Sequence, residues 1–282
     1  MERRQEERTQ QEKYEIFKSL HEKTAAFLIP NPWNAGTAKM LTSLGFQALA
    51  TTSAGLAFAH GHCDGISALS RGETLVNCRE IVEATHLPVS ADLEEGFGAS
   101  PDSCVETIRL AAGVGLVGGS IEDATGNPLS PIFEFEQAVD RVRAACETSR
   151  DLPFLLTARA ENFLHDKPDL DDTIRRLQAF EEAGADVLYA PGLPNLDAIR
   201  TVCEAVNKPV NVVMGRGGAT YTVKDLQDVG VKRISVGGSF ARAALGGFMK
   251  AAKEVLEQGT FHYASEALSH KEASDYMIRK ET

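Results

Sequence analysis

Acidic residues stand at the ends of two apolar runs of the sequence. Asp92 and Glu94 end one run, and Glu122 and Asp123 end the next. Residues two apart on a strand point to the same face, so Asp92 and Glu94 would lie together. Carboxylates that converge repel one another unless a cation neutralises them, and such hard oxygen ligands suit Mg2+ or Mn2+. We therefore expect a divalent-metal site here, although each acid taken alone would be an ordinary helix cap or a solvated side chain.

An arginine and a group of small residues end other apolar runs. Arg159 and Glu161 share one face of a strand, where a guanidinium could bind a substrate carboxylate through two parallel hydrogen bonds. The alternative is a structural ion pair between the two, because a buried arginine generally needs a carboxylate partner. The run Thr51–Gly55 could offer backbone N–H groups to a carboxylate or phosphate, or could serve close packing. Asp64, in the loop that follows, is a candidate catalytic residue.

Two further patterns each permit two interpretations. The turn Gly237–Gly238 follows the last apolar run and opens a helix, which is typical of a phosphate site in barrels but also of a simple tight turn. His60, His62 and Cys63 look like a soft-metal site. No further Cys or His follows at ligand spacing, and this favours a plain loop.

The elements that must position these residues alternate along the chain. Ser70 and Glu73 form a capping-box pattern, and Gly184 is a typical helix stop. Stretches of helical period are Ser70–Ala84, Pro101–Ala112, Glu134–Thr148 and Leu170–Ala183. Between and around them lie eight short apolar runs: Phe27–Trp33, Ala48–Ala54, Pro88–Glu94, Gly115–Asp123, Phe154–Glu161, Asp186–Gly192, Pro209–Gly215 and Arg233–Ser239.

Near-continuous apolar strands between helices indicate parallel strands that are buried on both faces. Eight such units in about 220 residues predict an α/β fold with a single (β/α)8 barrel of the TIM type. The rival is a doubly wound open sheet, but the first strand is followed by Asn-Pro-Trp-Asn-Ala-Gly and not by the dinucleotide fingerprint G-x-G-x-x-G. We expect a helical extension at 1–26, the barrel at 27–258 and a polar tail or helix at 259–282.

The composition excludes several classes of protein. The 282 residues carry 29 Lys and Arg against 40 Asp and Glu, which gives a net charge of −11. A general nucleic-acid binder needs a basic face, whereas an anionic substrate needs only a local cationic pocket. The five cysteines form no C-x-x-C pair, the charged stretch Met1–Lys13 lacks the apolar core of a signal peptide, and no apolar run of about 18 residues exists. These features predict a cytoplasmic protein without disulfides or a membrane span.

Several motifs together resemble the isocitrate lyase/phosphoenolpyruvate mutase superfamily. They are D-L-E-E-G-F-G at Asp92–Gly98, S-I-E-D at Ser120–Asp123, T-A-R-A-E at Thr157–Glu161, P-N-P-W-N-A-G at Pro30–Gly36 and T-T-S-A-G at Thr51–Gly55. The similarity spans about Phe27 to Lys253, and it is greatest to the short members described as 2-methylisocitrate lyase-like or carboxyphosphonoenolpyruvate phosphonomutase-like. The resemblance implies a (β/α)8 barrel whose last helix often swaps onto a neighbouring subunit, in a homodimer or homotetramer.

The same resemblance implies an enzyme that acts on a small 2-oxo or 2-hydroxy acid through an enolate bound to Mg2+. Asp92 would ligate the metal directly, and Glu94 and Glu122 would hold its waters. Arg159 would bind the substrate carboxylate and Asp64 would lie over the site. The remaining implied substrate contacts are the backbone around Thr52, Ser53 and Ala54, and the side chain of Asn211 with the distal part of the substrate.

The chain departs from the superfamily pattern in the loop after the fourth strand. The C–C lyases have K-[KR]-C-G-H there and the phosphonate enzymes a Lys–Thr–Asn type loop, whereas this chain has Ala124–Pro131, without Cys or His. Gly192 stands where many relatives have a glutamate. We expect a C–C bond lyase or decarboxylase that lacks the usual cysteine. The alternatives are a P–C bond enzyme of the phosphonopyruvate hydrolase or mutase type, and a protein that binds 2-oxoglutarate or oxalate without turnover.

Overall fold

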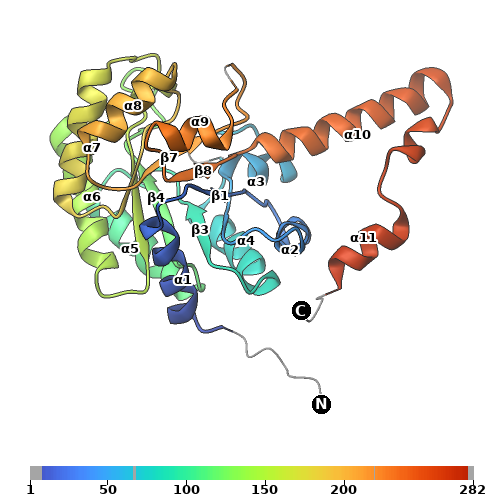
Figure 1. Ribbon diagram of the computed structural model, residues 1–282, viewed down its shortest axis with the longest axis horizontal. Helices are drawn as coiled ribbons and strands as arrows, with labels where there is room; N and C mark the ends of the chain where they lie inside the picture. Colours follow the sequence, from blue (N-terminus) through green and yellow to red (C-terminus); the bar gives the residue numbers. More distant parts are fainter. Residues whose placement is uncertain (1–7, 66–67, 219, 279–282) are drawn as a thin grey trace.

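One sheet of eight parallel strands forms the centre of the molecule, with helices packed around it (Figure 1). The structure is a computed structural model that describes residues 8–65, 68–218 and 220–278. The strands are β1 (Phe27–Ile29), β2 (Leu49–Ala50), β3 (Val89–Asp92), β4 (Gly118–Glu122), β5 (Leu155–Arg159), β6 (Val187–Tyr189), β7 (Val210–Val213) and β8 (Arg233–Ser235). Their hydrogen-bonded order is β1-β8-β7-β6-β5-β4-β3-β2.

The two strands at the ends of this order, β1 and β2, also approach each other. The backbone N–H of Ala50 donates to the carbonyl of Pro30 at 3.0 Å, and Nδ2 of Asn31 donates to the carbonyl of Thr51 at 2.8 Å. The sheet is therefore a nearly closed barrel, which confirms the predicted (β/α)8 fold. Each of the eight apolar runs of the sequence contains one strand.

Helices connect the strands and end where local sequence signals place their ends. Ser70 caps α4 in a complete capping box with Glu73, and α7 stops at Gly184, whose φ of 110° is in the left-handed region that glycine adopts freely. The helices are α1 (Gln10–Glu22), α2 (Ala35–Ser43), α3 (Ser53–Ala59), α4 (Arg71–Ala84), α5 (Pro101–Gly113), α6 (Phe135–Ser149), α7 (Leu170–Ala183), α8 (Leu196–Ala205), α9 (Val223–Asp228), α10 (Ser239–Gln258) and α11 (His270–Met277), with 3-10 turns η1 (Asn162–Leu164) and η2 (His262–Ser265).

Helix α10 leaves the barrel after β8 and projects away from it, and the chain then returns through η2 to α11 (Figure 1). Ala241 is its one buried residue. The end of α11 lies against α2, where Nζ of Lys39 donates to the carbonyl of Met277 at 3.0 Å. No helix in the described part of the chain has the length and apolar character needed to cross a membrane, and all five cysteines are unpaired.

Helix α1 closes the end of the barrel at which the strands begin. Phe17 and Leu20 pack in one apolar cluster with the first residues of β1 and β5, Phe27 and Leu155. His21, in the last turn of α1, is buried with them. Its ring meets Phe17 and Phe27 edge to face, with centroids 4.7 and 4.9 Å apart.

The imidazole of His21 is neutral in this position. Its Nδ1 lies 2.8 Å from the carbonyl oxygen of Phe17, which can only accept a hydrogen bond, so Nδ1 carries the proton. Its Nε2 faces Nη1 of Arg233 at 3.5 Å. Burial, together with the charge of Arg233, lowers the pKa of His21 to about 3.

This neutral histidine predicts a loss of stability in mild acid. Below pH ~6.5 the unfolded chain binds a proton at His21, whereas the folded protein does not until the pH nears about 3, so the free energy of unfolding falls through this window. Between pH 7.5 and 5 we expect His21 to account for a loss of up to about 2 kcal/mol. Urea denaturation of the wild type and of His21→Gln at each pH measures the free energy of unfolding, and the difference between the two proteins gives the contribution of His21. Parallel stability–pH curves for the two proteins would contradict the prediction.

Candidate active site

A continuous row of polar side chains crosses β4 to β8 on the inside of the barrel. In register, Glu122 pairs with Arg159, and Arg159 with Tyr189. Tyr189 then pairs with Asn211, and Asn211 with Arg233. Glu122 and Arg159 are the last residues of their strands, whereas Arg233 is the first of its strand. Because the strands of a barrel are tilted, the row descends from the carboxyl-terminal mouth into the barrel.

Arg159 is surrounded by three carboxylates at the mouth. Its Nη1 lies 2.9 Å from Asp92, its Nη2 lies 2.9 Å from Glu122, and its Nε lies 2.8 Å from Glu161. Burial alone would lower the pKa of Arg159, but the charges of Glu122, Glu161 and Asp92 outweigh it and raise that pKa. The guanidinium therefore keeps its positive charge. It forms the structural ion pair with Glu161 that one interpretation of the sequence predicts. It also lines the cavity, as the other interpretation, a substrate-binding arginine, requires.

Asp92 links this arginine to the loop after β2. One of its oxygens accepts from Arg159, and the other accepts from the backbone N–H and the hydroxyl of Ser53 at 3.3 and 2.8 Å. The hydroxyl of Thr51 also receives the backbone N–H of Asp92 at 3.1 Å. Thr52 caps α3 by accepting the N–H of Gly55. The small residues at this strand end thus hold the carboxylate of Asp92 in place.

The other predicted carboxylates lie in different surroundings. Burial raises the pKa of Glu122 well above its usual value; Arg159 opposes the shift, and Glu161, Asp92 and Glu94 add to it. Glu94 is buried beside this cluster in a left-handed turn with φ of 49° and does not line the cavity.

Asp123 does not join the carboxylates at the mouth, so of the three or four acids expected to converge there this one is excluded. It is the next residue after Glu122 and points to the opposite side of the sheet, where it meets Arg176 at 3.1 Å and accepts the backbone N–H of Glu161 at 2.8 Å. Burial raises the pKa of Asp123 to about 7. The structure thus gives Asp123 a supporting position behind Glu161.

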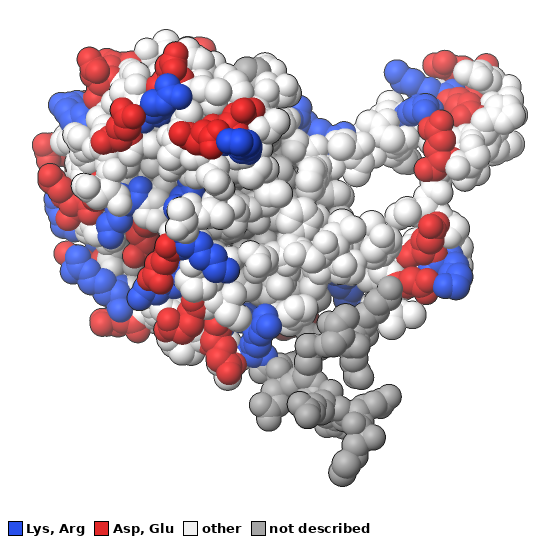
Figure 2. Space-filling view, in the orientation of Figure 1, with Lys and Arg blue, Asp and Glu red and all other residues white. Residues whose placement is uncertain are grey.

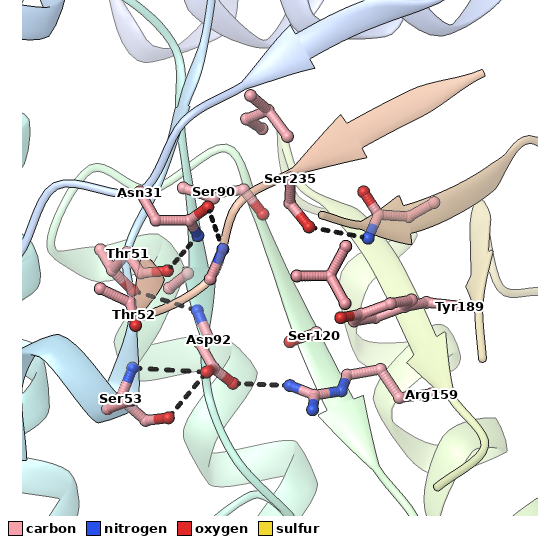
Figure 3. A pocket seen from close by; sticks show the side chains of 18 of the residues that line it. Asn31, Thr51, Thr52, Ser53, Ser90, Asp92, Ser120, Arg159, Tyr189 and Ser235 are labelled. Carbon is pink, nitrogen blue, oxygen red and sulfur yellow. Dashed lines mark hydrogen bonds and ion pairs between the residues drawn. The ribbon is translucent and has the colours of Figure 1, made fainter. Parts of the chain in front are cut away.

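A cavity of about 150 Å3 opens between these groups and the loop after β2 (Figure 3). Arg159 and Asp92, joined by their ion pair, lie side by side on its wall, and the ring of Tyr189 extends into it from β6 (Figure 3). The predicted site residues that line it are Thr52, Ser53, Ala54, Asp64, Asp92, Arg159 and Asn211. At the rim, partial burial and the charge of Asp92 raise the pKa of Asp64.

The glycine turn after β8 serves close packing. The N–H groups of Val236 and Gly237 donate to Oδ1 of Asn31 at 2.9 Å each, so both of these donors already have an acceptor. A Cβ at Gly238 would lie 2.9 Å from the Cβ of Ala54. These contacts favour the tight-turn interpretation over an anion site at this turn.

The two departures from the superfamily pattern, Gly192 and the loop after β4, also have a structural basis. Gly192 has φ of 88°, and a Cβ there would lie 2.8 Å from Cδ2 of Leu164, so a larger side chain would be strained and would displace Leu164. The loop after β4 folds back on itself through a bridge between Ala124 and Ile132. It brings no acid or base toward the cavity from 124–131.

The carboxylates at the mouth form a donor set that suits a hydrated cation. Among residues 8–65, 68–218 and 220–278, no three His, Cys, Asp or Glu side chains could enclose a metal ion by themselves. Mg2+, however, usually takes one or two protein carboxylates and completes its octahedron with water and substrate. Asp92 offers one such carboxylate on the cavity. Burial is the main cause of the raised pKa values of Glu122 and Asp64, and neighbouring carboxylates add to both shifts; a cation here would oppose that second contribution.

Sequence reasoning missed several side chains of the cavity, among them Asn31, Tyr189 and Arg233. Asn31 belongs to the motif at Pro30–Gly36, but the motif alone does not indicate what its side chain contacts. Tyr189 and Arg233 lie in strands that read as ordinary apolar runs. Tyr189 is two residues from Val187 and Arg233 is two residues from Ser235, so each pair points to the same face of its strand. This period of two shows which residues share a face, but it does not show whether that face lines a cavity or packs in the core.

Known proteins resemble the chain over most of its length. The model of the family described as phosphoenolpyruvate phosphomutase matches residues 17–256. A putative lyase/mutase from Burkholderia cenocepacia J2315 is 50% identical in sequence, with a TM-score of 0.93 and 96% of this chain and 97% of that chain covered. The 2-methylisocitrate lyase of Escherichia coli strain K12 is 29% identical over 206 residues, which are 70% of this chain and 69% of that enzyme.

A structure of phosphonopyruvate hydrolase in complex with oxalate and Mg2+ has the same fold. Its TM-score is 0.84 at 21% identity, with 94% of each chain covered. The family match extends from the middle of α1 almost to the end of α10 and so includes every strand of the barrel. The chain therefore belongs to the phosphoenolpyruvate mutase/isocitrate lyase superfamily.

Proposed function

We propose that this protein is a Mg2+-dependent lyase or decarboxylase that breaks a C–C bond in a small 2-oxo or 2-hydroxy diacid. The observation that carries the proposal is the cluster of Asp92, Glu122 and Glu161 around Arg159, of which Arg159 and Asp92 line a small polar cavity. Superfamily membership supports an enzyme that acts on small carboxylic acids.

Asp92 would ligate the metal, and Glu94 and Glu122 would accept hydrogen bonds from its waters. The excess of carboxylates over arginines at the mouth supports this assignment, as does the Mg2+ bound by the phosphonopyruvate hydrolase of the same fold. Mg2+, or Mn2+ in its place, would supply a Lewis acid that withdraws electrons from the carbonyl or hydroxyl carbon of the substrate.

The chain's own residues would bind and orient the acid. Arg159 would present its fixed positive charge to the substrate carboxylate at one side of the cavity. Thr52, Ser53 and Ala54 lie opposite, where the loop after β2 lines the same space. Asp64 would cover the site from the rim.

Tyr189 is the group that we propose as the proton donor. The loop 124–131 brings no acid into the site, whereas the ring of Tyr189 extends into the cavity with the guanidinium carbon of Arg159 5.1 Å from its centroid. Burial raises the pKa of Tyr189, so the phenol holds its proton at neutral pH. A neutral hydroxyl can donate a proton to a carbon that gains negative charge when a neighbouring bond breaks.

Turnover assays separate this function from its alternatives. A panel of 2-oxo and 2-hydroxy diacids with Mg2+ is expected to yield pyruvate, oxaloacetate or glyoxylate from at least one acid. Phosphate release from phosphonopyruvate would assign the P–C bond activity instead. Tight binding of oxalate or 2-oxoglutarate without turnover of any acid would assign the binding function, which the absence of an acid in the loop 124–131 favours.

Replacing Asp92 tests the metal site. We expect Asp92→Asn to weaken Mn2+ binding about 10- to 100-fold, because an amide oxygen lacks the charge of the carboxylate. The free ion can be followed by electron paramagnetic resonance. Asp197→Asn, at an exposed residue of α8, is the control and should bind Mn2+ as the wild type does. Unchanged Mn2+ affinity in Asp92→Asn would place the metal elsewhere.

Replacing Arg159 tests the carboxylate site. A lysine keeps the charge but has no planar fork, so it cannot satisfy three carboxylates and a ligand together. We expect Arg159→Lys to lower the affinity for pyruvate in the presence of Mg2+ about 10- to 100-fold. Calorimetry measures it, with Arg200→Lys on the exposed face of α8 as the control. Equal affinities would leave Arg159 as a structural residue only.

We also propose a homo-oligomer in which α10 and the segment after it pack against a second copy of the chain. Large apolar side chains are exposed along this arm, and Figure 2 shows few charged residues on its part nearest the barrel. An apolar helix that leaves its own barrel exposes more hydrophobic surface than a monomer usually carries. The exposed apolar residues are Phe240, Leu245, Phe248, Met249, Val255, Leu256, Phe261 and Leu268.

A charge on the arm should break the assembly. Phe248 is 67% exposed, and we expect Phe248→Glu to convert a dimer or tetramer into monomers because a carboxylate cannot be buried in an apolar interface. Light scattering after size exclusion gives the mass. The control is Leu110→Glu on the outer face of α5, which should keep the wild-type mass. A wild type that is monomeric would overturn the assembly.

A further inference from the structure

Arg233 is a buried cation in the barrel, and no carboxylate contacts it among the residues that the structure describes. Its relative exposure is 6%, yet it lines the cavity. Its Nε donates to Oδ1 of Asn211 at 2.9 Å, its Nη2 to the hydroxyl of Thr157 at 3.0 Å, and its Nη1 faces Nε2 of His21 at 3.5 Å. All three partners are neutral. Burial lowers the pKa of Arg233 to about 10, which still leaves it charged at neutral pH.

The contrast with Arg159 is informative because both arginines lie in the same row of the sheet. Arg159 has three carboxylate partners, whereas Arg233 has none in the described part of the chain. A buried charge without a counter-ion is strongly destabilising. A guanidinium has five N–H groups, and the three named contacts use three of them. Two N–H groups therefore remain for an acceptor that enters from the cavity.

The neighbours of Arg233 hold its side chain in position for such an acceptor. Asn211 is itself fixed, since its Nδ2 donates to the hydroxyl of Ser235 at 3.1 Å while its Oδ1 accepts from Arg233. Ser235 and Asn211 both line the cavity. From Arg159 at the mouth, the row leads down through Tyr189 to these groups. An extended ligand held at Arg159 would therefore direct its far end toward Arg233.

We propose that Arg233 binds a second carboxylate of the substrate, deep in the barrel, and so selects diacids over monoacids. This inference rests on the proposed function for the Arg159 end of the ligand. The fork of a guanidinium matches the two oxygens of a carboxylate, and such an anion would supply the missing counter-charge. Asn211, the residue expected to contact the distal part of the substrate, acts here as a positioning residue for Arg233.

Lactate and malate are suitable probes because they share a 2-hydroxy acid end and differ by one carboxylate. With Mg2+ present, we expect the wild type to bind malate at least tenfold more tightly than lactate. Arg233→Met should remove this preference and change the dissociation constant for lactate less than threefold. A preference that survives in Arg233→Met, or equal losses for both acids, would overturn the proposal. Arg200→Met serves as the control and should keep the preference.

A second measurement separates failure of this proposal from failure of the proposed function. Succinate has two carboxylates but no 2-oxo or 2-hydroxy group, and it is tested without Mg2+. It should raise the melting temperature of the wild type and not of Arg233→Met. If lactate binds without any malate preference, Arg233 has no such role and the proposed function stands. If neither hydroxy acid binds but succinate stabilises only the wild type, the Arg233 site stands and the proposed function fails.

Folding of the variant is the remaining control. Should Arg233→Met fail to fold, Arg233→Lys takes its place, since lysine keeps the charge within the barrel. Lysine lacks the fork, so the preference for malate should fall at least threefold. An unchanged preference in Arg233→Lys would overturn the proposal.

Discussion

The ion pairs between Arg159 and its three carboxylates hold the mouth of the barrel together. They join β3, β4 and β5, and through Asp92 they reach the loop after β2. Carboxylates so close to one another would repel without the guanidinium, and the guanidinium would be too costly to bury without them. One cation does not balance all the acids, however. The remaining negative charge is what suits the mouth to a divalent metal ion and its hydration shell.

The barrel interior is electrostatically divided along its axis. Carboxylates outnumber arginines at the mouth, whereas deeper down Arg233 lies among Asn211, Thr157 and a neutral His21. A ligand with a metal-binding end and a negatively charged far end would complement both regions. The same arrangement explains why α1 matters, because its last turn closes the barrel below Arg233 and keeps His21 uncharged next to a cation.

The sequence predicted the barrel and the residues at its mouth, because apolar runs and the polar residues that end them are local patterns. Asp92 and Arg159 could be found in this way, since strand ends meet at one edge. Asp123 was misplaced because adjacent residues on a strand face opposite sides, and the sequence alone does not say which side faces inward. Arg233 could not be found from the sequence because its place in the cavity depends on the register of β5 to β8, and that register is set by tertiary pairing.

The most direct test of the central claim is calorimetric titration of the purified protein with oxalate, with and without Mg2+. Oxalate mimics the enolate that forms when a 2-oxo acid loses a proton or a carbon group, because it is planar and presents adjacent negatively charged oxygens. If the carboxylates around Arg159 form a metal-dependent acid site, oxalate binds with Mg2+ and binds at least tenfold more weakly without it. Absence of binding under both conditions would contradict the account and leave the chain with the superfamily's scaffold but without its chemistry.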